Sequence, residues 1–170
     1  SYGELEQRAN RLAAWLNGKG IGLGDVVAIH SIQRPETVLA HLATYKIGAI
    51  AATVSQLTGF ETMHHIMSDS GARVMFTQNA LWDPFRKSRS LFSMLEHVVC
   101  AESPDSNEIS FSEAERASNA CFRPVITRAS DPALLIYTSG STGLPKGILH
   151  GHRILHALNA SLELFYNLEL

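Results

Sequence analysis

Short apolar runs recur along this chain and are separated by segments in which apolar residues follow a helical spacing. The runs lie at residues 26–29, 49–54, 73–77, 97–100, 133–136 and 147–150. A continuous apolar run of this length is typical of a strand that is buried on both faces, since such a strand need not alternate polar and apolar residues. We therefore expect these runs to be the strands of a sheet.

Helices are predicted between the strands. The apolar face of the first helix, at residues 1–17, is expected at Leu5, Ala9, Leu12, Ala13 and Leu16. Gly18 and Gly20 follow its end, as is common after helices. Pro35 suits the first turn of a second helix, because proline there removes no hydrogen bond. The apolar stripe of this second helix is expected at Val38, Leu39, Leu42 and Tyr45.

Three pairs of residues have the spacing of a capping box, in which a side chain and a glutamate bond reciprocally to the backbone at a helix start. These pairs are Ser1 and Glu4, Thr58 and Glu61, and Ser112 and Glu115. The second pair opens a helix that is expected to end near Gly71, and the third opens a short helix. Residues 81–95 are expected to hold one or two short helices interrupted at Pro84, residues 120–130 to form an irregular link, and a last helix to begin at about His152.

This alternation of strands and helices predicts an α/β fold with a mostly parallel sheet and helices on both faces. In such sheets, ligands bind beside the carboxyl ends of the strands. The segment that follows the run at residues 133–136 is therefore the first place to look for a binding site.

That segment, residues 137–147, reads Tyr-Thr-Ser-Gly-Ser-Thr-Gly-Leu-Pro-Lys-Gly. Glycines let a backbone approach an anion closely, and successive N–H groups can point into one concavity. Serine and threonine hydroxyls add uncharged donors, and Lys146 adds one compact positive charge. The composition predicts a loop that binds the polyphosphate of a nucleotide. A flexible surface turn has a similar composition and is the alternative.

The spacing excludes the Walker loop, whose pattern is G-x-x-x-x-G-K-[ST]. Counted from Gly140, the second glycine position holds Pro145, and the position after Lys146 holds Gly147 rather than a hydroxyl residue. Proline also lacks the N–H that a Walker loop aims at phosphate. Because an apolar run rather than a helix follows, we expect the loop to join two strands.

Residues 137–147 closely resemble the phosphate-binding signature of adenylate-forming enzymes, which include acyl-CoA synthetases, peptide-synthetase adenylation domains and luciferases. Residues 1–5 and 8–13 resemble the opening helix of that family, and residues 45–50 and 69–73 resemble its next strand–helix units. The resemblance implies that residues 1–170 are a single partial domain, the N-terminal portion of the AMP-binding domain of a longer enzyme.

The resemblance also implies the roles of the loop residues. The residues expected to bind the β- and γ-phosphates of ATP are Thr138, Ser139, Gly140, Ser141, Thr142, Gly143 and Lys146. Lys146 is the expected catalytic residue, because it offsets the charge on departing pyrophosphate. The hydroxyl of Thr142 is the candidate ligand for Mg²⁺, which prefers oxygen ligands.

By the same resemblance, the enzyme uses ATP to convert a carboxylic acid to an acyl-adenylate, and the thiol of coenzyme A then displaces AMP. An acyl-CoA synthetase is favoured because residues 57–61 resemble those of short-chain, medium-chain or aryl acyl-CoA ligases. Three alternatives stay open: a peptide-synthetase adenylation domain with a carrier-protein thiol as acceptor, a phosphate-binding module that is inactive by itself, and a kinase-like ATPase.

Other polar residues give weaker signals. His150, His152 and His156 have a spacing that suggests metal, but no cysteine or acid joins them at suitable spacing. By the family resemblance, His152 is interpreted as structural or as support for the loop. His64 and His65 are neighbours on a predicted helix and point in different directions, so they are expected to form no site. The two tryptophans, Trp15 and Trp82, are interpreted as core or partly exposed anchors.

Composition narrows the class of protein further. The 170 residues suit one domain, and 45% of them are hydrophobic. A net charge of −2 gives no basic face for nucleic acid, and no apolar run approaches the length of a membrane span. Cys100 and Cys121 fit neither a disulfide framework nor a metal pattern, so we expect reduced, buried thiols and a cytoplasmic protein. A homodimer stays open.

Overall fold

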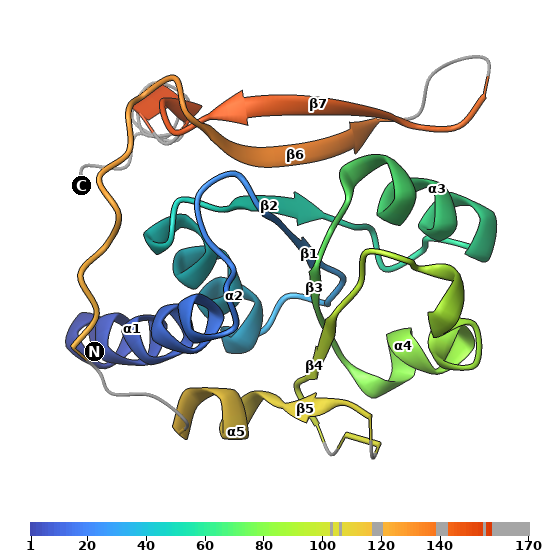
Figure 1. Cartoon of the computed structure of the whole chain (residues 1–170), viewed down its shortest axis with the longest axis horizontal. Helices are drawn as coiled ribbons and strands as arrows, with labels where there is room; N and C mark the ends of the chain where they lie inside the picture. Colours follow the sequence, from blue (N-terminus) through green and yellow to red (C-terminus); the bar gives the residue numbers. More distant parts are fainter. Residues whose placement is uncertain (103, 106, 117–120, 139–142, 155, 158–170) are drawn as a thin grey trace.

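The computed structural model describes residues 1–102, 104–105, 107–116, 121–138, 143–154 and 156–157. Within them, helices and strands alternate along the chain as expected (Figure 1). The helices are α1 (Tyr2–Gly18), α2 (Pro35–Lys46), α3 (Phe60–Ser70), α4 (Asn79–Arg86), the 3-10 turn η1 (Arg89–Leu91) and α5 (Phe111–Arg116). The strands are β1 (Val26–Ile29), β2 (Ile50–Thr53), β3 (Val74–Thr77), β4 (His97–Cys100), β5 (Ile109–Ser110), β6 (Pro132–Thr138) and β7 (Lys146–Gly151).

The strands form one seven-stranded sheet in the order β5-β4-β3-β1-β2-β6-β7. All described pairings are parallel except that of β6 with β7, which is antiparallel. The mostly parallel α/β sheet predicted from the sequence is therefore confirmed. The carboxyl ends of β1 to β6 lie along one edge of the sheet, which is the edge where open α/β sheets bind their ligands.

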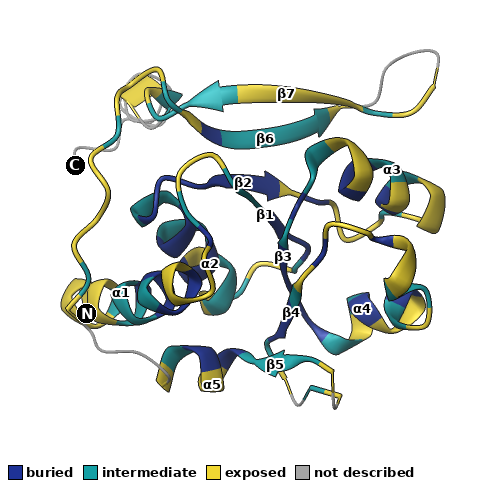
Figure 2. Ribbon diagram, in the orientation of Figure 1, coloured by how far each residue is buried: buried dark blue, intermediate teal, exposed yellow. Residues whose placement is uncertain are grey.

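Helices cover both faces of the sheet and enclose two separate apolar cores (Figures 1 and 2). α1, α2 and α5 pack on one face around fully buried residues such as Leu12 and Leu39. α3 and α4 pack on the other face, where Met63 and Trp82 are fully buried. The strands serve both cores because successive side chains of a strand point to opposite faces of the sheet.

Several local predictions are confirmed. The Ser1 hydroxyl accepts a hydrogen bond from the backbone N–H of Glu4 at 3.3 Å, and the Glu4 carboxylate accepts one from the Ser1 amino group at 2.7 Å, so the first capping box is present. Gly71 has a φ of 63° and ends α3 in the left-handed conformation that glycine tolerates best. Pro35 lies in the first turn of α2.

The other two predicted capping boxes are wrong. Gly59 is the residue that precedes α3, and no side chain caps it. In α5, the backbone N–H of Glu113 donates to the Ser110 hydroxyl at 3.1 Å, and Glu115 instead receives two hydrogen bonds from Arg8 of α1. A tertiary contact thus uses the Glu115 side chain that the local pattern had assigned to capping.

Three further expectations are corrected, and one strand was missed. The buried side of α2 consists of Leu39, Ala40, Ala43 and Thr44, whereas Val38 is 49% exposed. Pro84 lies inside α4 and does not interrupt it, because the helix is short and burial of its aromatic side chains offsets the missing hydrogen bond. Cys121 is exposed because the link that contains it runs over the surface, although Cys100 is buried as expected. The two-residue strand β5 was not predicted.

Candidate phosphate-binding site

The glycine-rich loop is carried by the hairpin of β6 and β7, at the carboxyl edge of the sheet. The chain leaves β6 after Thr138 and returns in β7 at Lys146, which confirms that the loop joins two strands. Four of the predicted phosphate ligands lie outside the described residues: Ser139, Gly140, Ser141 and Thr142, the last being also the candidate Mg²⁺ ligand. Thr138, Gly143 and Lys146 are described.

Thr138 and Lys146 stand directly opposite each other in the hairpin. Opposite residues of an antiparallel pair place their side chains on the same face of the sheet, so the hydroxyl and the ammonium group leave the hairpin together. Both residues are exposed. The base of the loop therefore presents one uncharged donor and one positive charge on one face, which is a suitable combination for phosphate oxygens.

Steric constraints explain why glycine occupies two positions at this loop, residues 143 and 147. Gly143 has a φ of 150°, a conformation that residues with a side chain rarely adopt. At Gly147, a Cβ atom would lie 3.1 Å from the side chain of Leu135 and 3.3 Å from the ring of Tyr137. Because Tyr137 pairs with Gly147 across the hairpin, the missing side chain makes room for the tyrosine ring.

Helix α3 contacts both arms of this hairpin. The Tyr137 hydroxyl donates a hydrogen bond to Oδ2 of Asp69 at 2.7 Å. On the other arm, Nε2 of His65 lies 2.9 Å from the carbonyl oxygen of Pro145, and the His65 ring meets the Tyr137 ring edge-on with centroids 6.3 Å apart. Burial and the hydrogen bond to Asp69 raise the pKa of Tyr137 above its usual value, so the phenol keeps its proton.

The contact made by His65 has no local signal in the sequence, because its partner lies 80 residues further along the chain. His64 and His65 do point apart, as predicted: the His64 ring stacks on Phe60 with centroids 6.4 Å apart, on another side of the helix from the hairpin. The available hint was the four-residue spacing of His65 and Asp69, which places both side chains on one face of α3.

The histidines after the loop have separate surroundings. The His152 ring packs edge-on against Tyr45 of α2 with centroids 6.1 Å apart, and its backbone N–H donates to Asp131 at 3.0 Å. No group of three or more histidine, cysteine, aspartate or glutamate side chains that could hold a metal ion is present in the part of the chain that the structure describes. These contacts agree with a structural role for His152.

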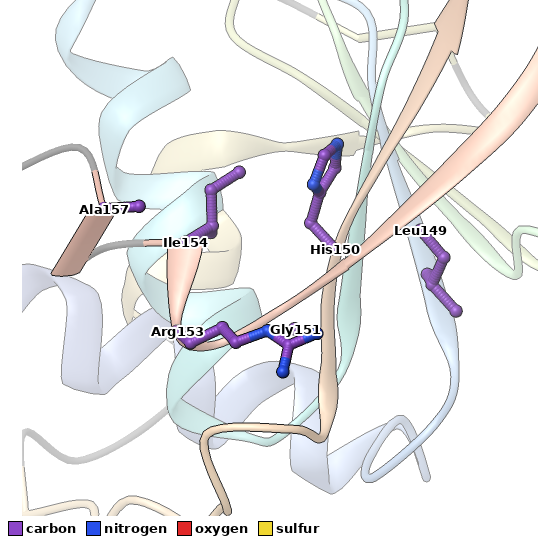
Figure 3. A pocket seen from close by; sticks show the side chains of 6 residues that line it. All are labelled: Leu149, His150, Gly151, Arg153, Ile154 and Ala157. Atoms are coloured by element: carbon purple, nitrogen blue, oxygen red, sulfur yellow. The ribbon is translucent and has the colours of Figure 1, made fainter. Parts of the chain in front are cut away.

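A cavity of about 320 Å³ lies at the end of β7 that is farther from the loop (Figure 3). The residues that line it are Leu149, His150, Gly151, Arg153, Ile154 and Ala157. In β7 the lining begins at Leu149, three residues after Lys146. The described candidates for phosphate binding, Thr138, Gly143 and Lys146, do not line the cavity, so it is not part of the phosphate site.

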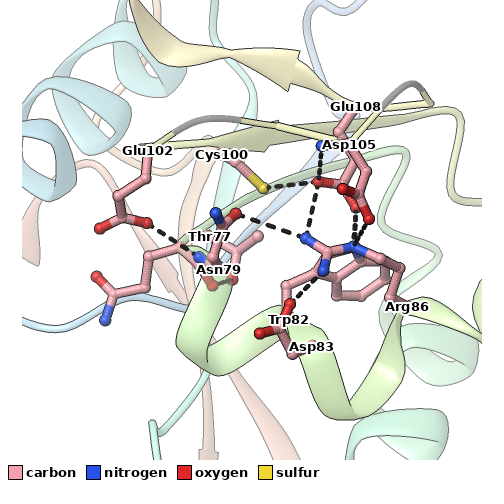
Figure 4. A network of polar contacts seen from close by, with 10 residues as sticks. Thr77, Asn79, Trp82, Asp83, Arg86, Cys100, Glu102, Asp105 and Glu108 are labelled. Carbon is pink, nitrogen blue, oxygen red and sulfur yellow. Dashed lines mark hydrogen bonds and ion pairs between the residues drawn. The ribbon is translucent and has the colours of Figure 1, made fainter.

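A buried polar cluster lies near the opposite end of the strand order, between α4, β4 and the residues before β5 (Figure 4). Glu108 accepts hydrogen bonds from Nε1 of Trp82 and Nε of Arg86, each at 2.7 Å, and from Sγ of Cys100 at 3.3 Å. Burial raises the pKa of Glu108, but the bonds from Arg86 and Cys100 outweigh it and lower the value to about 2. Burial raises the pKa of Cys100 to about 12. The cluster thus consists of a fixed carboxylate and an unreactive thiol, which is a structural arrangement.

A mostly parallel sheet with a polar, glycine-containing hairpin loop at its carboxyl edge is typical of a nucleotide-binding α/β protein. The AMP-binding enzyme family matches residues 1–169, and the chain therefore belongs to this family of adenylate-forming enzymes. Membership of the family implies the use of ATP.

Individual relatives agree with this assignment. The chain is 32% identical over 188 residues to the acetyl-coenzyme A synthetase of Cronobacter sakazakii. This match covers 97% of this chain and 28% of that protein. It is 31% identical over 153 residues to tyrocidine synthase 3 of Brevibacillus parabrevis, covering 90% of this chain and 2% of that protein. The crystal structure of the anthranilate CoA ligase AuaEII in complex with anthranoyl-AMP superposes with a TM-score of 0.87 and 30% identity, covering 93% of this chain and 30% of that chain.

The chain thus spans less than a third of the length of these relatives. Within the described residues, no helix has the length and apolar character needed to cross a membrane.

Proposed function

We propose that this chain is the phosphate-binding portion of an adenylate-forming acid–thiol ligase, and that residues 1–170 are the first part of its AMP-binding domain. The observation that carries the proposal is the register of the β6–β7 hairpin, which places Thr138 and Lys146 on one face at the base of the loop. A preorganised positive charge at this point can stabilise the charge that develops on a leaving pyrophosphate.

In the proposed reaction, a carboxylate oxygen of the substrate attacks the α-phosphorus of ATP, and the bond from that phosphorus to the bridging oxygen of pyrophosphate breaks. Negative charge grows on the departing pyrophosphate, and Lys146 offsets it. Thr138 supplies an uncharged donor beside it, with Ser139, Ser141 and Thr142 as further donors, while Gly140 and Gly143 let the backbone come close. The chain contributes positioning and charge stabilisation, and no covalent bond forms between the enzyme and the substrate.

Mg²⁺ belongs to the proposal only as a partner of the ATP phosphates, whose charge it would reduce. Its candidate ligand, Thr142, lies outside the described residues. The described carboxylate that touches the hairpin, Asp69, already accepts the hydrogen bond of Tyr137. The described residues therefore supply no ligand set for this ion, and no step is assigned to it.

Coenzyme A is the acceptor that we propose, because residues 57–61 resemble those of acyl-CoA ligases. Its thiol would attack the carbonyl carbon of the acyl-adenylate and release AMP. The second candidate is a peptide-synthetase adenylation domain, favoured by the similar identity to tyrocidine synthase 3. Release of AMP that depends on coenzyme A would support the first candidate, whereas stable retention of the adenylate in its presence would support the second.

The test of the proposed function is the exchange of pyrophosphate into ATP by the full-length protein, with a panel of carboxylic acids. We expect exchange that depends on one class of acid and falls on the order of 10²-fold in Lys146→Ala, since one stabilising group at the developing charge is lost. Lys87→Ala, at an exposed lysine after α4, is the matched control. Hydrolysis of ATP that needs no acid, without exchange, would instead indicate an ATPase.

A further inference from the structure

We propose that His65 and Asp69 are positioning residues for the phosphate loop: together they form a brace on α3 that fixes both arms of the β6–β7 hairpin and so sets the place of Thr138 and Lys146. This inference rests on the proposed function, because it assigns the brace a role in holding the phosphates of ATP.

The brace reaches the hairpin at two points that are close to the loop on either side. Asp69 accepts from the hydroxyl of Tyr137 at 2.7 Å, and Nε2 of His65 meets the carbonyl oxygen of Pro145 at 2.9 Å. Tyr137 directly precedes Thr138, and Pro145 directly precedes Lys146. Thr138 and Lys146 are therefore each one residue away from a point that α3 holds.

The chemistry of the His65 contact is defined by its partner. A carbonyl oxygen only accepts, so Nε2 of His65 carries the proton and donates it. Pro145 lies just before β7, outside the ladder of backbone hydrogen bonds that begins with Lys146. The ring of His65 also contacts the Tyr137 ring, so the two points of the brace support each other.

The brace acts through the hairpin and not on the nucleotide. Tyr137 neighbours Thr138 in the strand, and neighbouring strand residues point to opposite faces of the sheet. Tyr137 points towards α3, so Thr138 and Lys146 point away from it. His65 and Asp69 thus lie behind the phosphate-binding face, where they can control the position of the arms without touching phosphate.

The experiment is steady-state kinetics of ATP–pyrophosphate exchange by the full-length protein with its cognate acid. For His65→Leu, which removes the donor, we expect the KM for ATP and for pyrophosphate to rise about three- to tenfold, the range that one lost hydrogen bond produces. The KM for the acid should stay within twofold. His65→Gln restores an N–H donor at similar reach and should return both constants close to wild type.

Two further variants sharpen the test. His64→Leu alters the neighbouring histidine, which stacks on Phe60 and not on the hairpin, and should leave all constants unchanged. Tyr137→Phe keeps the ring and removes the bond to Asp69, and should raise the same two constants as His65→Leu. Amide hydrogen exchange of residues 132–138 and 146–151 should become faster in both His65→Leu and Tyr137→Phe, and this readout does not depend on activity.

The possible outcomes distinguish a failure of the brace from a failure of the proposed function. Wild-type exchange with unchanged KM for ATP and pyrophosphate in His65→Leu would overturn the brace and leave the proposed function standing. A lowered melting temperature with unchanged constants, or a failure of His65→Gln to differ from His65→Leu, would reduce His65 to a structural residue and also overturn it. A wild-type protein without acid-dependent exchange would overturn the proposed function itself, and the positioning role with it.

Discussion

At the scale of single residues, the carboxyl end of β1 holds an unusual side chain. His30 follows β1 and is 1% exposed, and neither of its ring nitrogens makes a hydrogen bond of ordinary geometry with the described residues. Burial lowers the pKa of His30 to about 4, and the backbone of Ser55 opposes this only in part. The imidazole is therefore neutral in the folded protein and acquires a proton more easily when the protein unfolds.

This asymmetry predicts a pH-dependent stability. Between pH 6.5 and about 4 the unfolded state binds the proton and the folded state does not, so stability falls as the pH falls through that interval. Relative to His30→Leu, the wild-type protein should lose about 2–3 kcal/mol by pH 4.5. Melting temperatures of the two proteins from pH 7.5 to 4.5 provide the measurement. Two parallel curves would show that His30 does not carry this dependence.

The candidate site was predictable from the sequence only where its chemistry is local. Thr138, Gly143 and Lys146 belong to one continuous sequence motif, and this motif alone predicted a loop between two strands. The contacts of His65 and Asp69 were not predictable, because they depend on how α3 packs against a hairpin far along the chain. A single sequence records the residue types of such a contact but not the packing that creates it.

At the scale of elements, Glu108 fastens the residues before β5 to α4. Its side chain is 2% exposed and receives hydrogen bonds from Trp82, Arg86 and Cys100. Removal of this carboxylate leaves the Trp82 N–H without its acceptor and deprives Arg86 of a buried partner. One residue, Glu108, which directly precedes β5, therefore joins this segment to α4.

We expect Glu108→Ala to lower the free energy of unfolding by about 2–4 kcal/mol, because a buried ionic and hydrogen-bonded group loses one partner. Urea denaturation at neutral pH measures the loss. Glu113→Ala, at an exposed glutamate of α5, is the control and should change stability by less than about 0.5 kcal/mol. Equal effects of the two substitutions would contradict a special role for the cluster.

Local sequence patterns predicted some of the helices and strands well and others poorly. The strands β1, β3 and β4 were predicted well because a strand buried on both faces is apolar throughout. Helix starts were predicted correctly at α1 and α2 but not at α5, where Glu115 had the spacing of a capping box but pairs with Arg8 of another helix at 2.7 Å. Strand β5 has two residues and gives no pattern to detect.

At the scale of the whole molecule, the sheet ends in β7, which pairs only with β6 among the described residues. Leu144, Ile148 and Leu149, in and just before this strand, are 53%, 45% and 54% exposed. An edge strand with unpaired backbone groups and exposed apolar side chains is a site for association with other chains. The relatives that this chain matches are more than three times as long, so they have material with which to cover such an edge.

We therefore expect residues 1–170, produced alone, to self-associate at micromolar concentration and to catalyse no acid-dependent exchange. Ile148→Lys, which places a charge on the edge strand, should shift the chain towards monomer, as charged edge residues do. Sedimentation velocity of the two chains measures the difference. A wild-type chain that is monomeric over the whole concentration range would show that this edge is already protected.

Substitutions in the two cores of the molecule are expected to have different effects. The core on the face of α3 rests on Met63, Ile66 and Met67, and thus also supports the brace behind the loop. The core around α1 and α2 meets the hairpin through Leu134 of β6 but holds neither residue of the brace. Damage to either core lowers the amount of folded protein, and damage to the core beneath α3 is expected to slow turnover per molecule as well. Selection for speed therefore acts chiefly on one side of the sheet, whereas selection for abundance acts on both.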